Sequence, residues 1–385
     1  MNRSLSLFLD FSRWSAAFLV VLGHTAHFLI VGSAGAAAPG VGTDVLYLVT
    51  SLGHCAVMVF FVISGYLVGG ITLNRWLKSG PDLTDYAISR FARIYTVLVP
   101  ALTIGYAIDY VGMHWFDHAG LYENVSQYHI GSLDDVGMRL NAMTYIGNLL
   151  MLQGTWVTSL GSNGPLWSLA YEWWYYCLFS FSAAALLYKG WLRAILISFL
   201  VILILMLPVT MLMWMSIWFM GVGAFFLSRR TSFSLDPRIG SAIFAAAIIV
   251  SLSAQNADML DPRTVWVAFG RDFLVGCGYC VALLSFSKAS RALPFEHFHR
   301  WAAGFSYSIY LFHFPVLLLI VAMGERHLGW HVLEQPSLVS VGRVAVVVAI
   351  VYAVGYLFSM YTERRTDAIR DFLRKQTARL PAFTR

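Results

Sequence analysis

Residues 10–27, DFSRWSAAFLVVLGHTAH, decide the fold, because they form an apolar run that contains both an arginine and a histidine. In an α-helix eleven residues advance about 16 Å and turn by roughly 1100°, close to three full turns. Arg13 and His24 are therefore expected on one face, with His27 one turn beyond His24. Asp10, three residues before Arg13, can pair with it.

An arginine and a histidine at membrane depth are costly, and such side chains usually mark a functional site. The alternative is that Arg13 extends toward a lipid headgroup while His24 makes one hydrogen bond between helices. The face that Arg13, His24 and His27 share favours a site.

The composition is that of a membrane protein, with 58% hydrophobic residues, 12% charged residues and a mean hydropathy of +0.68. Long apolar runs with few charges predict membrane-spanning helices, so the expected fold class is all-α, a polytopic bundle. Runs of suitable length predict ten spans, at 8–31, 46–73, 94–112, 166–188, 191–207, 209–228, 239–254, 264–287, 303–323 and 339–361. The first run is longer than the apolar region of a signal peptide and is expected to be retained.

The positive charges test this topology. With a cytoplasmic N-terminus, twenty of the 26 Lys and Arg residues fall in inner segments, five lie outside and Arg13 lies within the first span. This asymmetry predicts that both termini are cytoplasmic. The net charge of +6 is then a topology signal, and nucleic acid is not expected as a partner. No internal repeat is visible.

Cysteine carries little information about function. The four cysteines all fall within apolar segments, and Cys277 and Cys280, although spaced as CxxC, have no acidic or histidine cluster beside them. Membrane helices bury cysteine readily, so packing is expected and no metal site is predicted.

Two further motifs lie toward the cytoplasmic side of the predicted bundle. Ser64 and Tyr66 belong to VMVFFVISGYLVGG (57–70), whose small residues let neighbouring backbones approach closely. Packing is the simpler role for Ser64, because a nucleophilic serine needs a base and an oxyanion site beside it. Arg90 and Arg93 are one helical turn apart, an arrangement that suits a polyphosphate ligand. Ordinary anchoring of the helix by positive charge is the alternative.

Two more candidates lie deeper in the predicted bundle. Glu172, in GSNGPLWSLAYEWWYY (161–176), is about two turns into its span, where a carboxylate is costly unless used. His313, in GFSYSIYLFHFPV (304–316), is near mid-membrane and is followed by Pro315. A lone histidine in such a helix often serves packing alone.

Together these motifs resemble the acyltransferase-3 family of integral membrane acyltransferases. The resemblance rests on LDFSRWSAAFLVVLGH (9–24), FFVISGY (60–66), RFARIY (90–95), GPLWSLAYEWWYY (164–176) and FSYSIYLFHFPV (305–316), in the family's order. The chain departs from the family at Thr96 and Arg364, where proline is common. The resemblance implies a membrane domain over residues 1–365, followed here by a basic cytoplasmic tail, 366–385.

The resemblance also implies transfer of an acyl group, usually acetyl, from cytoplasmic acyl-CoA to a hydroxyl of a carbohydrate such as exopolysaccharide or lipopolysaccharide. The expected partners are acyl-CoA as co-substrate, a carbohydrate acceptor and the lipid bilayer, with no bound cofactor and with homo-oligomerisation left open. The expected location is the cell (inner) membrane. The depths predicted for the motifs suit an acyl-CoA that enters from inside and meets Arg13, Arg90 and Arg93.

The mechanistic hypothesis makes His24 the general base, because a neutral imidazole with a pKa of about 6.5 suits proton transfer at neutral pH. Glu172 is expected to orient His24, to compensate its charge or to bind the sugar, while Asp10, Ser64, Tyr66 and His313 support the site. A covalent acyl-enzyme through His24 or Ser64 stays open. The rival function is a proton-coupled transporter or flippase that uses the intramembrane His and Glu as a relay.

Overall fold

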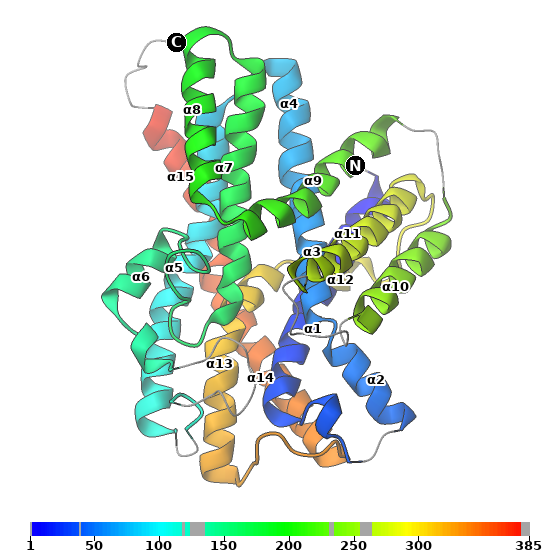
Figure 1. The fold of residues 1–385 in the computed structure, drawn as a ribbon, viewed down its shortest axis with the longest axis vertical. Coiled ribbons are helices and arrows are strands. Elements are labelled where there is room, and N and C mark those ends of the chain that lie inside the picture. Colours follow the sequence, from blue (N-terminus) through cyan, green and yellow to red (C-terminus); the bar gives the residue numbers. More distant parts are fainter. Residues whose placement is uncertain are drawn as a thin grey trace. The chain divides into compact units, whose positions relative to one another are not determined.

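The computed structural model describes residues 2–37, 40–117, 120–123, 135–230, 235–254 and 264–378, and within these ranges the chain is helical, with no β-strand (Figure 1). The α-helices are α1 Arg3–Leu29, α2 Val41–Thr50, α3 Gly53–Ser64, α4 Ile71–Ser79, α5 Leu83–Trp115, α6 Ala142–Leu149, α7 Trp167–Leu187, α8 Gly190–Met206, α9 Val209–Arg230, α10 Pro237–Ser253, α11 Thr264–Lys288, α12 Glu296–Ala303, α13 Ser306–Leu328, α14 Leu338–Tyr361 and α15 Thr366–Ala378.

All ten predicted spans coincide with helix, which confirms the all-α class. Within the described residues seven helical segments are long and apolar enough to cross a membrane, as expected of a multi-pass membrane protein. They are Arg3–Leu29, Val41–Ser79, Leu83–Trp115, Val209–Arg230, Thr264–Lys288, Ser306–Leu328 and Leu338–Ala378. Two shorter apolar helices, α8 and α10, match further predicted spans.

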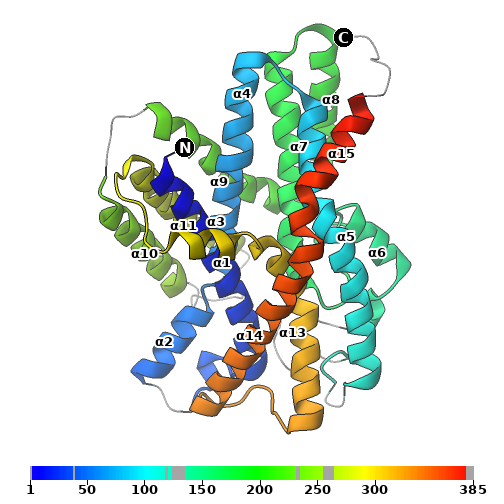
Figure 2. The same ribbon diagram turned by 180° about the vertical axis from the view of Figure 1, so that it is seen from behind.

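Helix α5 is longer than the span predicted for it. It begins at Leu83, eleven residues before the predicted span 94–112, with Asp85 in its first turn, where an acidic side chain favours a helix N-terminus. Most of the predicted tail is also helical, since α15 covers Thr366–Ala378, while residues 379–385 lie outside the described residues. Arg374 of α15 pairs with Asp85, so α15 packs against α5 (Figure 2).

The chain forms two compact units, each assembled from separate stretches of sequence. The first unit comprises Met1–Ala16, Ser51–Asp82 and Tyr171–Ala303, and the second comprises Ala17–Thr50, Leu83–Ala170 and Gly304–Arg385. Helices α1 and α7 each contribute residues to both units.

In the first unit the end of the segment 57–70 packs against α9 by close backbone approach. The α3 helix continues into a π-helical turn, Gly65–Gly70, that lies on α9. A Cβ on Gly65 would lie 1.8 Å from the Trp218 carbonyl oxygen, and one on Gly221 would lie 2.1 Å from that of Val62. Glycine is therefore required at both positions, which bears out the expectation that small residues here let backbones approach.

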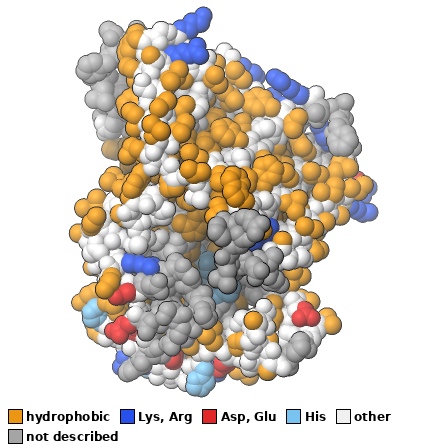
Figure 3. Space-filling model, viewed as in Figure 1, with side chains coloured by type: hydrophobic (Ala, Val, Ile, Leu, Met, Phe, Trp, Pro, Cys, Tyr) orange, Lys and Arg blue, Asp and Glu red, His pale blue; other side chains and the backbone are white. Residues whose placement is uncertain are grey.

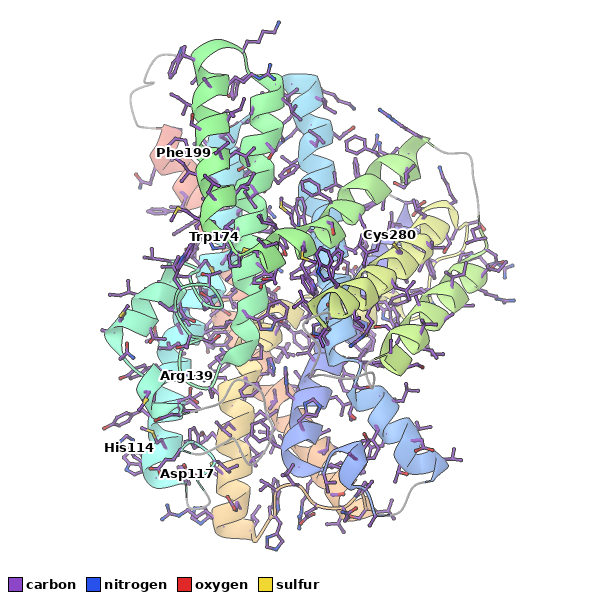
Figure 4. The ribbon with its side chains drawn as sticks, in the orientation of Figure 1. His114, Asp117, Arg139, Trp174, Phe199 and Cys280 are labelled. Carbon is purple, nitrogen blue, oxygen red and sulfur yellow. The ribbon has the colours of Figure 1, made fainter. Side chains whose placement is uncertain are left out.

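The first unit also carries an apolar outer surface on α8. Its large side chains are exposed, among them Trp191, Phe199 and Leu205. Hydrophobic side chains cover much of the face shown in Figure 3, and Phe199 points away from the ribbon of α8 in Figure 4. An exposed apolar surface of this kind is in keeping with a membrane helix.

In the second unit α13 is the central helix and lies beside α14 and α5 (Figure 2). The C-terminus of α1 is tied to the loop before α14, because the carbonyls of Phe28 and Leu29 accept hydrogen bonds from the backbone N–H groups of Leu333 and Glu334, at 3.0 and 2.9 Å. Carbonyls that end a helix lack partners within it, so this loop satisfies two of them.

Candidate functional site

The structure brings together two histidines that are 289 residues apart in sequence. The rings of His24 on α1 and His313 on α13 stack, with centroids 5.4 Å apart and planes at 21°. Phe314 meets His24 edge-on at 5.2 Å, and His27 does so at 6.5 Å. Side chains of α1 and α13 therefore form one cluster of imidazole and aromatic rings in the second unit.

The hydrogen bonds of His313 define which ring nitrogen carries the proton in its neutral form. Nδ1 lies 2.8 Å from the carbonyl oxygen of Tyr310 and 3.2 Å from that of Ile309. A carbonyl only accepts, so Nδ1 carries the hydrogen and Nε2 is left as an acceptor. Nε2 is buried and has no partner among the described residues. A bound hydroxyl or amide group can supply the missing donor.

A buried carboxylate holds the N-terminal turn of α13. Oε2 of Glu363 accepts hydrogen bonds from the backbone N–H and the hydroxyl of Ser308, both at 3.0 Å. Oε1 of Glu363 lies 3.0 Å from Nη1 of Arg93, whose guanidinium carbon is 4.7 Å from the centre of the Tyr307 ring. Because the first N–H groups of a helix lack internal acceptors, Glu363 acts as a cap supplied from a distant part of the chain.

Arg90 and Arg93 lie on one helix, α5, as the spacing predicts. Their environments differ, because Arg93 pairs with Glu363 whereas the guanidinium of Arg90 is 6.0 Å from the centre of the Tyr86 ring. Arg93 thus has a role within the protein in addition to the acyl-CoA contact predicted for it. Glu363 was not predicted as a site residue, because beside Arg364 and Arg365 it indicates the inner membrane surface.

The segment 160–168 connects α5, α6 and α13 within the second unit. Asp109 on α5 accepts hydrogen bonds from the backbone N–H and hydroxyl of Ser162, both at 2.7 Å. Nδ2 of Asn163 donates to the carbonyl of Leu311 at 2.8 Å. The hydroxyls of Ser168 and Tyr310 are 2.5 Å apart. Of this motif only Glu172 was predicted as a site residue. The polar residues of its turn were not, although a turn rich in Gly, Ser and Asn beside a functional helix indicates a site.

The remaining predicted residues belong to the first unit. Nη1 of Arg13 lies 3.9 Å from Oδ1 of Asp10, the pairing that their spacing allows. The hydroxyl of Tyr66 is 3.2 Å from that of Ser228.

Ser64 and Glu172 are joined through Tyr176. The Tyr176 hydroxyl donates to Oε1 of Glu172 at 2.6 Å and lies 3.1 Å from the Ser64 hydroxyl, which also accepts from Nε1 of Trp218 at 3.0 Å. These contacts agree with a packing and hydrogen-bonding role for Ser64. The partnership of Glu172 with His24 stays a prediction.

The described residues contain no group of three or more His, Cys, Asp or Glu side chains arranged to hold a metal ion. Cys277 and Cys280 both lie on α11, and Cys280 is marked in Figure 4.

Comparisons with known proteins agree with the arrangement of the motifs. A family model described as an acyltransferase domain, Acyl_transf_3, matches residues 6–360. The chain therefore belongs to the acyltransferase-3 family. It is similar to an "O-acetyl transferase" of Shigella phage Sf6, with 22% identity over 343 residues that cover 84% of this chain and 87% of the phage protein. No solved structure matches the chain.

Proposed function

We propose that this protein is a membrane O-acyltransferase that moves an acyl group, most simply acetyl, from cytoplasmic acyl-CoA to a hydroxyl of an exported or cell-surface carbohydrate. Membership of the acyltransferase-3 family supports the reaction class, and the phage relative is named for O-acetyl transfer. The observation that carries the proposal is the stacked pair of His24 and His313, with a buried Nε2 of His313 that has no hydrogen-bond donor among the described residues.

In the proposed reaction His24 takes the proton of the acceptor hydroxyl as its oxygen attacks the thioester carbonyl. The carbon–sulfur bond breaks, the acyl group stays on the acceptor oxygen, and the CoA thiolate takes up the proton. Acid–base catalysis of this kind contributes roughly 10²- to 10⁴-fold to a rate. Nε2 of His313 accepts a hydrogen bond from the bound substrate and orients it beside His24.

The charges support a donor that enters from the cytoplasm. Arg90 and Arg13 are the proposed contacts of the acyl-CoA phosphates, and Arg93 contributes while it pairs with Glu363. The ten-span topology with both termini in the cytoplasm, in the inner membrane of the cell, belongs to the same proposal. The distribution of Lys and Arg supports it.

The test is a transfer assay with purified protein in lipid vesicles, radiolabelled acetyl-CoA and a panel of polysaccharide extracts. Wild type is compared with His24→Ala, and His114→Ala is the matched control. His114 is an exposed histidine of α5 and is marked in Figure 4. Its Nδ1 lies 2.8 Å from the carbonyl oxygen of Tyr110, four residues earlier, so it is a histidine in a helix outside the proposed site. The thermal unfolding of each variant shows that it is folded.

Label on a polysaccharide with wild type and His114→Ala, but not with His24→Ala, supports the proposal. Label on the protein alone supports acyl transfer through a covalent intermediate. Absence of label, together with no rise in the melting temperature on addition of acetyl-CoA, contradicts the proposal and favours a transporter, since a ligand that binds the folded state raises that temperature.

A further inference from the structure

A proline within α13 leaves one backbone carbonyl without its helical donor. Pro315 lies inside the helix Ser306–Leu328 and has no N–H, so the carbonyl four residues earlier, that of Leu311, cannot make the usual bond. The proline ring also displaces that carbonyl outward. Leu311, His313 and Pro315 are all buried. In an apolar interior an unsatisfied carbonyl is strongly destabilising, so the helix needs an outside donor at this turn.

Asn163 supplies that donor. Its Nδ2 lies 2.8 Å from the Leu311 carbonyl oxygen, and the asparagine is only 3% exposed. Since a carbonyl accepts only, the nitrogen end of the amide must face Leu311. Oδ1 of Asn163 is then buried and has no donor among the described residues, like Nε2 of His313 two residues beyond Leu311.

The backbone on both sides of Asn163 is held in place. Ser162 is bound to Asp109, and the backbone N–H of Leu160 donates to Oδ1 of Asn148 at 3.1 Å. Gly161 has a φ of +55°, which suits glycine, and a Cβ there would lie 2.2 Å from Oδ2 of Asp109. The amide of Asn163 is therefore presented to α13 by a rigid support.

We propose that Asn163 is a positioning residue: by replacing the hydrogen bond that Pro315 removes, it holds the turn of α13 that carries His313, and so keeps His313 stacked against His24. This inference rests on the proposed function for its effect on acyl transfer. The hydrogen bond itself, and its dependence on Pro315, are independent of any activity.

The test is a double-mutant cycle of Asn163→Ala, Pro315→Ala and the double variant, each purified in full length. Alanine at position 315 restores an N–H donor to the Leu311 carbonyl, so the amide of Asn163 is no longer needed. For each variant the melting temperature is measured, together with kcat and KM for acetyl-CoA in the transfer assay. Asn148→Ala, alone and with Pro315→Ala, is the matched control, because the Asn148 amide supports the same segment through the Thr158 carbonyl and the Leu160 N–H.

Asn163→Ala is expected to lower kcat by about 10- to 100-fold with little change in KM, the effect of a small displacement near the reacting groups. It is also expected to lower the melting temperature. In the double variant both values return to those of Pro315→Ala alone. Asn148→Ala is expected to lower the melting temperature without any rescue by Pro315→Ala.

The inference is overturned if the effects of Asn163→Ala and Pro315→Ala simply multiply in kcat and add in melting temperature, since no shared carbonyl then couples them. It is also overturned if Asn163→Ala leaves kcat unchanged. If wild type itself transfers no acetyl group, the proposed function fails. The coupling in melting temperature then still decides whether Asn163 replaces the missing bond.

Discussion

Nη1 of Arg93 lies 3.0 Å from Oε1 of Glu363, an ion pair that joins α5 to the segment just after α14. Through its other oxygen Glu363 binds Ser308 in the first turn of α13. The helix that carries His313 is thus held at its N-terminus by Glu363 and in its middle by Asn163. The first prediction concerns this pair.

Replacing Arg93 by methionine is expected to destabilise the protein by about 2–3 kcal/mol. Removing one partner of a buried ion pair typically costs about 3–5 kcal/mol, and a third of the Arg93 side chain is exposed, which reduces the loss. Adding Glu363→Gln should restore part of the melting temperature, because the uncompensated charge is gone. Arg90→Met is the comparison variant, and the contact with acyl-CoA proposed for Arg90 predicts that it raises KM for acetyl-CoA. An Arg93→Met protein that melts like wild type contradicts the prediction.

The second prediction distinguishes the role of Nδ1 of His313 from the role of its Nε2. Asparagine can place its amide nitrogen near the position of Nδ1 and keep the bond to the Tyr310 carbonyl, whereas it has no group at the position of Nε2. His313→Asn is therefore expected to lower kcat by about 100-fold, and to lower the melting temperature only through the lost ring stacking on His24. His313→Gln, with an amide nearer the position of Nε2, should lose less activity. Equal rates for wild type and His313→Asn would assign His313 to packing alone.

The third prediction compares two glycines of α9. Gly221→Ala would place a Cβ 2.1 Å from the Val62 carbonyl oxygen, so we expect destabilisation of about 1–3 kcal/mol or more. Gly223→Ala has open space around it and should be neutral or stabilising by up to about 1 kcal/mol, since alanine favours a helix. Thermal unfolding of both variants measures the difference. Similar melting temperatures would show that the close approach of α3 and α9 is absent.

The fourth prediction concerns a buried carboxylate of the first unit that sequence analysis did not single out. Asp272 on α11 accepts from Nε1 of Trp214 at 2.7 Å and lies 2.9 Å from Nε2 of His54. Asp272→Leu leaves the indole N–H without an acceptor and should destabilise the protein by about 1–3 kcal/mol. Trp214→Phe with Asp272→Leu removes the indole N–H together with the carboxylate and should recover part of that loss, while the contact between His54 and the carboxylate stays lost. Unchanged unfolding of Asp272→Leu would refute this account.

Much of the helical framework could be predicted from sequence because hydropathy and helical period are local properties. The ten apolar runs all proved helical, and the eleven-residue spacing of Arg13 and His24 placed both on α1. The length of α5 was underestimated, because the polar turns before Arg93 continue the helix without being apolar enough to read as a span. The family motifs are contiguous as well, and residues 6–360 match the family as their order indicated.

The sequence by itself determined that the long apolar runs are helical and to which family the chain belongs, because both depend on residues close together in the chain. Only the tertiary structure decided that His313 stacks on His24, that Glu363 caps α13 and that Asn163 replaces the bond lost at Pro315. These contacts join residues far apart in the chain, and they depend on how side chains pack between helices.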